Sequence, residues 1–118
     1  EIMEQLTMPI ASGADHRSNQ YRIVQIAGTL ATTALNGRGI LQNKPNTNED
    51  ATIAVIGRSK AIAGGTLTAG AHLAVTSGGF VTAAVSGGVF CGFAEVAASS
   101  GSAVWGQFNF ANLGYLNA

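Results

Sequence analysis

The side chains that could carry acid–base, nucleophilic or metal chemistry are few in this 118-residue sequence, and they stand apart from one another. His16 and His72 are the only histidines, and Cys91 is the only cysteine. Neither histidine belongs to an H-E-x-x-H motif, and no C-x-x-C pair has the spacing of a metal site. A lone cysteine cannot form an intrachain disulfide, so we interpret Cys91 as a small apolar core residue.

The carboxylates do not suggest catalysis either. Glu49 and Asp50 are neighbours in a polar loop, where carboxylates are usually solvated. Glu95 stands in an apolar stretch, where burial could raise its pKa and make it a general base. We favour an edge position or an ion pair between subunits for Glu95. Its candidate partners are Arg22, Arg38 and Arg58.

Motifs of enzymes that bind phosphate or use a serine nucleophile do not occur. The sequence has no G-x-S-x-G elbow, and its glycine-rich run A-G-G-T-L-T-A-G lacks the G-K-[S/T] of a phosphate loop. We therefore predict a protein that is not an enzyme. We expect it to have no catalytic residue, no metal, no cofactor and no small-molecule substrate.

Composition argues against nucleic acid and membrane partners. The net charge is zero, so no long-range field attracts the chain to nucleic acid or to an acidic membrane surface. Residues 61 to 94 contain no Asp, Glu, Lys or Arg, but glycine pairs interrupt this stretch before it reaches the length of a membrane-spanning helix. A single cysteine is consistent with assembly in a reducing bacterial cytoplasm.

The hydrophobic pattern has the period of strands. Apolar and polar residues alternate or cluster in short runs separated by glycine turns, and no sustained helical stripe occurs. The chain is predicted to be all-β, a small antiparallel β-barrel or β-sandwich that includes β-tulip-like arrangements. The expected strands are 21–26, 52–56, 89–94 and 103–110, with a hairpin turn at Asn36-Gly37 and a turn or bulge at 57–60.

Residues 1–20 differ from the rest, because they hold several charges, Pro9 and Gly13 without a persistent period. We interpret residues 1–20 as an extended N-terminal arm and residues 21–118 as a single β domain. Arms of this kind are often pinned on a neighbouring molecule.

Charge is distributed unevenly along the chain. Charged residues make up 10% of the sequence, against about 25% in an ordinary domain. Every Lys and Arg lies within the first 60 residues, and Glu95 is the only Asp, Glu, Lys or Arg after Lys60. Strand edges are usually protected by charged side chains. The edges in the second half must therefore close into a barrel or be covered by a partner.

The stretch from Lys60 to Val75 resembles the central segment of the capsid cement, or decoration, proteins of tailed bacteriophages. In that family a strand leads into a glycine-rich turn and an L-x-x-G-x-x-L pattern. Gly78-Gly79-Phe80-Val81 follows here in the corresponding place, and the run from Val89 to Ala98 is similar to the family's G-x-A-x-E-A-A. The resemblance extends from Thr52 to Phe110, about half of the chain.

This resemblance implies a non-enzymatic structural protein that binds the outer surface of a phage head. Its partners would be the major capsid protein and further copies of itself, in a homotrimer or, as the alternative, a dimer. Another virion component, such as a head-fibre base or a minor capsid or tail protein, is the second hypothesis, and a carbohydrate-binding β module is the third. The residues expected at the capsid or oligomer interface are Met3, Leu6, Met8, Ile10, Arg17, Tyr21, Glu95 and Trp105.

Overall fold

The computed structural model describes residues 5–33, 35–85, 88–111 and 113–115. These residues form strands, turns and irregular segments without a helix, which confirms the predicted all-β class. Within them no segment could cross a membrane as a helix. The strands are β1 (Gln5–Ala11), β2 (Ile23–Val24), β3 (Gly39–Leu41), β4 (Asp50–Ile62), β5 (His72–Thr76), β6 (Phe80–Ala83), β7 (Val89–Phe90), β8 (Gly92–Ala94), β9 (Ala103–Asn109) and β10 (Gly114–Tyr115).

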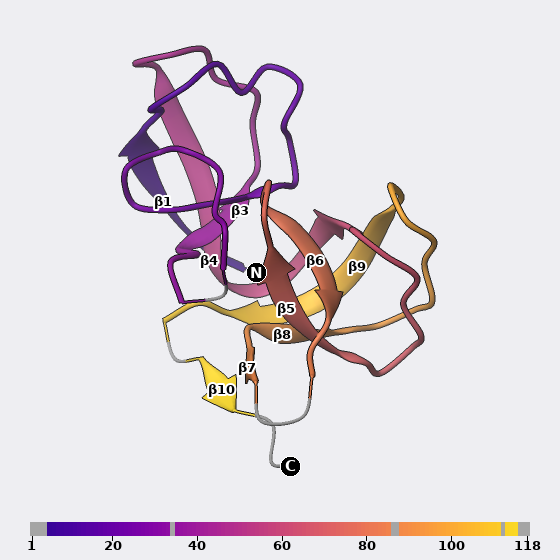
Figure 1. Cartoon of the computed structure of the whole chain (residues 1–118). Helices are drawn as coiled ribbons and strands as arrows, with labels where there is room; N and C mark the ends of the chain where they lie inside the picture. Colours follow the sequence, from indigo (N-terminus) through magenta and orange to yellow (C-terminus); the bar gives the residue numbers. More distant parts are fainter. Residues whose placement is uncertain (1–4, 34, 86–87, 112, 116–118) are drawn as a thin grey trace, which may run out of the picture.

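The main sheet is antiparallel and is organised around β4. Its order is β2-β3-β4-β9-β8-β5-β6, and β1 also pairs with β4. Strands β7 and β10 form a separate two-stranded sheet. Figure 1 shows that β1, β3 and the first half of β4 form one lobe, whereas β5, β6, β8 and β9 form a second lobe at the other end of β4.

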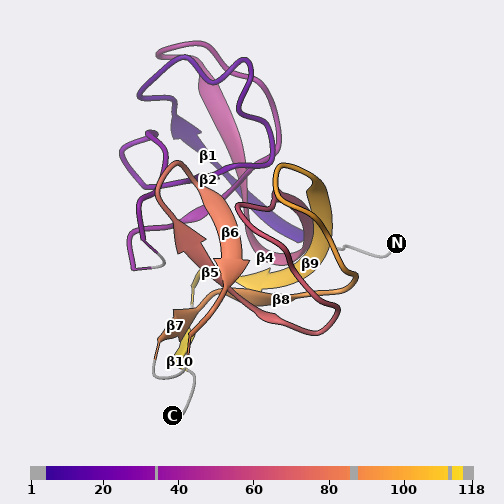
Figure 2. The same ribbon diagram turned by 45° about the vertical axis from the view of Figure 1, so that its right-hand side comes forward.

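The second lobe is a sheet nearly closed into a barrel. Beyond the end of β4, Ala63 forms a parallel bridge with Val81 of β6. The backbone N–H of Gly64 also donates to the Val81 carbonyl at 2.7 Å. The first strand of the lobe therefore meets its last, as the curvature of β9, β8 and β5 in Figure 2 illustrates. Closure leaves few edge groups without partners in the half of the chain that lacks charge.

Strand β4 also connects two hydrophobic cores. Ala51 and Ile53 are buried in the smaller cluster and Ala61 in the larger one. Val55 packs against both clusters. Between the two, Gly57 adopts a φ of 119°, and the pairing of β1 with β4 shifts register just before it. This glycine allows one strand to bend from the first lobe into the second.

The predicted arm contains a strand of the main sheet. Gln5 lies opposite Gly57 and Ala11 opposite Asp50, so β1 pairs with the first half of β4. The chain that follows is held by backbone hydrogen bonds, including Ser12 N–H to the Glu49 carbonyl at 2.9 Å. His16 is buried, and its Nε2–H donates to the Gly28 carbonyl at 2.6 Å. The division of the chain into an arm of residues 1–20 and a β domain of residues 21–118 stays a prediction.

Two local expectations were wrong, and a third was confirmed only in part. Of the turn or bulge expected at residues 57–60, the turn does not occur because β4 continues through the bend at Gly57 to Ile62, whereas the pairing with β1 does shift register just before Gly57. The strand expected from residue 21 to 26 is reduced to β2, since Tyr21 has a φ of 70°, outside the β region. Asn36-Gly37 does not join two strands directly. Its Asn36 side chain instead accepts hydrogen bonds from the N–H groups of Thr32 and Thr33 within a longer loop.

The bend in β4 predicts that Gly57→Ala destabilises the protein by about 1–3 kcal/mol, because an L side chain is strained at this φ. Chemical denaturation of the variant and the wild type measures this loss. Gly65→Ala is the matched control, since a Cβ there meets no atom within 4 Å and its φ is not positive. Equal stability of Gly57→Ala and the wild type would show that the bend does not depend on glycine.

Candidate interaction surface

The few reactive side chains are separated in space as they are in sequence. His72 is exposed and packs edge-on against Phe90, with ring centroids 4.5 Å apart. His16 is buried, and its Nδ1 accepts a hydrogen bond from the Asn19 amide at 3.0 Å. No group of three or more His, Cys, Asp or Glu residues is placed to hold a metal ion in the described part of the chain.

Cys91 lies in the larger core, where its Sγ–H donates to the Leu73 carbonyl at 3.4 Å. Burial raises the pKa of this thiol to about 12, because the surrounding apolar side chains cannot solvate a thiolate. The thiol is therefore protonated at neutral pH and packs as a small apolar group.

One solvent-facing side of strands β1, β4, β9 and β8 combines exposed apolar side chains with charged and aromatic ones. We call it the outer face. Leu6 of β1 lies opposite Ile56 of β4, and Phe93 of β8 lies opposite Gln107 of β9. Leu6, Ile56 and Phe93 are 54%, 37% and 40% exposed. These three large apolar side chains thus lie on one face of the sheet and face solvent, with Asn109 and Gln107 of β9 between Ile56 and Phe93.

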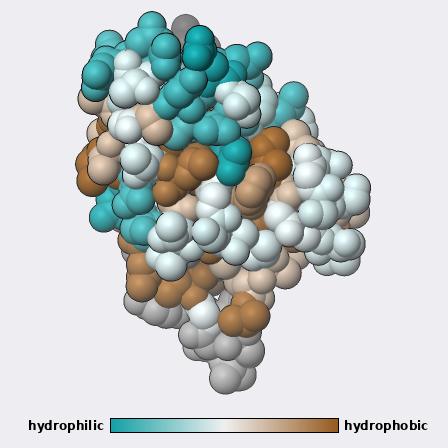
Figure 3. Space-filling view, turned by 45° about the horizontal axis from the view of Figure 1, so that its top comes forward, coloured by the Kyte–Doolittle hydropathy of each residue, from teal (hydrophilic) through white to brown (hydrophobic). Residues whose placement is uncertain are grey.

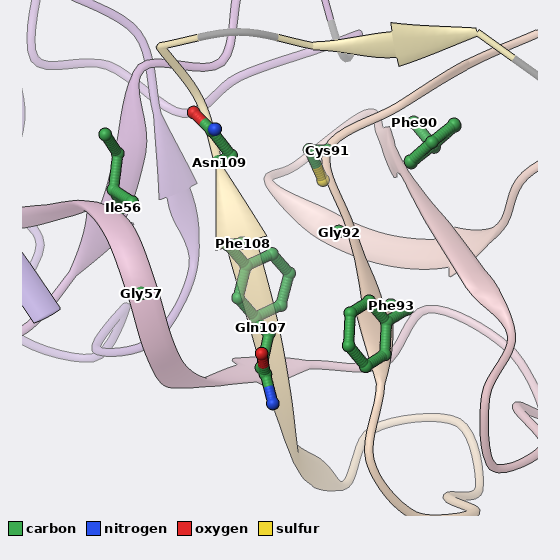
Figure 4. Close-up of a pocket in the computed structure, with 9 residues that line it drawn as sticks. All are labelled: Ile56, Gly57, Phe90, Cys91, Gly92, Phe93, Gln107, Phe108 and Asn109. Atoms are coloured by element: carbon green, nitrogen blue, oxygen red, sulfur yellow. The ribbon is translucent and has the colours of Figure 1, made fainter. Parts of the chain in front are cut away.

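A groove of about 360 Å³ lies between Ile56 and Phe93 (Figure 4). Gly57 and Gly92 line it on either side of β9, and each pairs with Phe108. A Cβ on Gly92 would lie 2.1 Å from the Gln107 carbonyl oxygen, so only glycine fits at this position. Gly92 thus lets β8 approach the backbone of β9 closely beside the Phe108 ring.

A charged and aromatic ladder continues the outer face along β4 and β9. The guanidinium of Arg58 lies 4.0 Å from the centre of the Trp105 ring, and its Nε is 2.9 Å from a carboxylate oxygen of Glu95. Lys60 Nζ lies 5.3 Å from the Trp105 ring and 5.6 Å from that of Tyr21. These contacts hold the side chains in place before any partner arrives.

Glu95 forms its ion pair within the chain. It bonds Arg58, one of the three arginines considered, and the expectation of an edge position or an ion pair between subunits stays a prediction. The Arg22 guanidinium instead packs 4.3 Å from the Phe80 ring, and its Nε donates to the Gly78 carbonyl.

A second groove of about 500 Å³ opens on another part of the surface. Its described lining is apolar except for Arg38. Figure 3 shows that hydrophilic side chains gather on the lobe of β1, β3 and the first half of β4, while apolar ones form separate patches between them. The residues that line the second groove are Met8, Ile26, Leu35, Arg38, Val55, Phe110, Ala111 and Leu113.

The structure distributes the predicted interface residues over several places. Leu6, Tyr21, Glu95 and Trp105 come together on the outer face, and Met8 lines the second groove. Sequence reasoning missed Ile56 and Phe93, and it named Arg58 only as one of three candidate partners of Glu95. Recognising residues 57–60 as strand would have placed Ile56 and Arg58, two residues apart, on one face of β4.

The remaining predicted residues serve other roles or fall outside this description. Ile10 is buried in the smaller core, and Met3 lies outside the described residues. Arg17 is exposed and forms an ion pair with Asp15, with 2.7 Å between Nη2 and Oδ2. Its side-chain hydrogen bonds lower the pKa of Asp15 to about 2, so this carboxylate stays ionised until the pH falls to that value.

Comparison with known proteins finds a similar fold. No protein family and no curated protein matches the sequence. A solved structure that the fold does match is described as the head fiber gp8.5 N base in bacteriophage phi29. The match has a TM-score of 0.68 at 14% identity, and it covers 92% of this chain and 99% of that one. At this identity the likeness shows a shared fold.

The environment of Cys91 predicts that the native protein resists alkylation by iodoacetamide at pH 8, because the thiol is both buried and protonated. Mass spectrometry of the intact chain measures the adduct. The same chain in denaturant should react fully and serves as the control. Rapid labelling of the folded protein would contradict the burial of Sγ.

Proposed function

We propose that this chain is a non-enzymatic structural protein of a bacteriophage virion, located on the outer surface of the head. The observation that carries the proposal is the fold match to a head-fibre base, because it extends over nearly the whole of both chains. The resemblance of residues 52–110 to head decoration proteins supports the same location by a separate line of reasoning.

The outer face is the surface that attaches to the head, and the major capsid protein is its partner. Tightly bound interfaces combine an apolar centre with a few Trp, Tyr and Arg side chains that contribute most of the binding energy. Here the exposed apolar side chains of Leu6, Ile56 and Phe93 lie on the same face as Arg58 and Trp105. Since cation–π contacts and an ion pair already order the ladder, little side-chain entropy remains to be lost on binding.

Two roles on the head are compatible with this surface. The base of a head fibre is the first, because the matched structure is such a base. A cement protein that stabilises contacts between capsid subunits is the second. It is favoured by the low charge of the chain, since uncharged, small polar surfaces pack well against protein. In both roles a homotrimer, or else a dimer, would strengthen attachment by engaging several equivalent sites at once.

The attachment surface predicts that Phe93→Ser and Ile56→Ser each weaken binding to phage heads lacking the protein by about tenfold or more, as loss of an interface anchor does. Co-sedimentation of purified chain with heads over a concentration series measures the affinity. Val85→Ser is the matched control, because Val85 is 73% exposed and lines neither groove.

Denaturation curves accompany the binding series, so that weaker attachment is not confused with unfolding. Wild-type affinity in both outer-face variants would move the attachment site elsewhere. Failure of the wild-type chain to bind heads at all would overturn the proposed function.

Copy number separates the two roles. A cement protein fills the equivalent positions over the whole shell, whereas a fibre base occupies only the positions that carry fibres. Quantitative mass spectrometry of purified virions, with the major capsid protein as the internal standard, is expected to give the lower, fibre-like ratio. A ratio near that of the major capsid protein would favour cement.

A further inference from the structure

The second groove combines an apolar lining with a cation, and the outer face does not use it. Ile26 and Leu35 are 60% and 63% exposed, so both present large apolar side chains to solvent. Phe110 is buried and Val55 half-buried, and Met8 completes the apolar lining. A concave surface of this kind fits an extended peptide segment with apolar side chains.

Arg38 gives the groove its charge preference. Its Nη1 donates to the backbone carbonyls of Leu35 and Gly37 at 3.4 and 3.2 Å, which fixes the guanidinium beside the groove. Within the described residues, its Nε and Nη2 form no hydrogen bond or ion pair. No described residue of the lining is acidic. The groove therefore suits a segment that brings a carboxylate together with apolar side chains.

Three of the four acidic side chains that the structure describes already have partners elsewhere. Asp15 pairs with Arg17, and Glu95 pairs with Arg58. Glu49 accepts a hydrogen bond from the Asn46 N–H at 2.6 Å within its own loop. In the sequence, the residues that combine acid and large apolar groups are Glu1-Ile2-Met3-Glu4.

Chain geometry favours the groove of another copy over that of the same copy. Met8 lies opposite Ile53 and Gln5 opposite Gly57, so β1 leads away from Met8 over three residues, or about 10 Å at about 3.4 Å per residue. Residues 1–4 would have to reverse direction and then cover this distance, yet a reverse turn alone takes four residues.

We propose that Glu1–Glu4 of one copy docks in the second groove of a neighbouring copy, with Ile2 and Met3 against Ile26 and Leu35 and a glutamate on Arg38. The contact is heterologous, since it joins two different surfaces. Repeating it generates a closed ring when the rotation between copies allows. This inference does not rest on the proposed attachment to a phage head, because it concerns self-association of the chain alone.

A charge exchange tests the contact in the full-length chain by sedimentation velocity over a concentration series. The wild type is expected to self-associate, and Arg38→Glu to weaken self-association by about tenfold or more. The double variant Glu1→Arg/Glu4→Arg should weaken it similarly. Combining all three substitutions should restore association, because the charges are complementary again. Lys44→Glu is the control for a change of net charge at an exposed position that lines neither groove.

A second variant tests the apolar part of the contact and leaves the described body of the protein unchanged. Ile2→Ser/Met3→Ser should reduce self-association as strongly as Arg38→Glu, with an unchanged denaturation midpoint. A wild type that remains monomeric throughout the concentration series would overturn the proposal. So would charge-exchanged chains that fail to associate although denaturation shows them folded. Head binding measured separately distinguishes this failure from failure of the outer face.

Discussion

The bend of β4 at Gly57 is the constraint on which the rest of the structure depends. One strand of 13 residues supplies partners to β1, β3 and β9 and inserts side chains into both hydrophobic cores. An unbent strand of this length would continue out of the first lobe and could not start the barrel of the second. Because φ is 119° at Gly57, the strand turns into the second lobe and stays paired with β1 and β9. After the register shift just before Gly57, Ile56, Arg58 and Lys60 lie on one face of β4 and belong to the outer face.

The same bend explains why the outer face is hollowed. Phe108 lies between Gly57 on one neighbouring strand and Gly92 on the other. Gly57 and Gly92 line the groove, and Ile56 and Phe93, one residue away on the same strands, also line it. A feature required by backbone geometry thus also produces a surface that a partner can fill.

Strand class was predictable because alternation and glycine turns are local signals, and the predicted last strand, 103–110, nearly coincides with β9. The missed features depend on contacts between distant residues. Gly57 resembles a turn residue in sequence, and only its pairing with Phe108 and Gln5 keeps it within a strand. Likewise, no spacing in the sequence indicates that Glu95 would meet Arg58, which lies 37 positions away. The candidate surface was therefore predicted in part, through Leu6, Tyr21 and Trp105, but without the residues that link them.

The uneven distribution of charge has a different consequence in the folded chain from the one that the sequence suggested. The uncharged half was expected either to close on itself or to be covered, and the bridge between Ala63 and Val81 shows that it closes. Its lack of charge is thus explained largely within one molecule. Among the described residues, large exposed apolar side chains also occur in the first 60 residues, where the Lys and Arg side chains lie. Examples are Leu6, Ile26 and Leu35. Arg58 lies on the outer face and Arg38 lines the second groove. Each arginine leaves the apolar side chains beside it accessible, and its charge limits which partners can approach. The argument for self-association therefore rests on the first half of the chain, whereas the outer face also uses Phe93 and Trp105 of the second half.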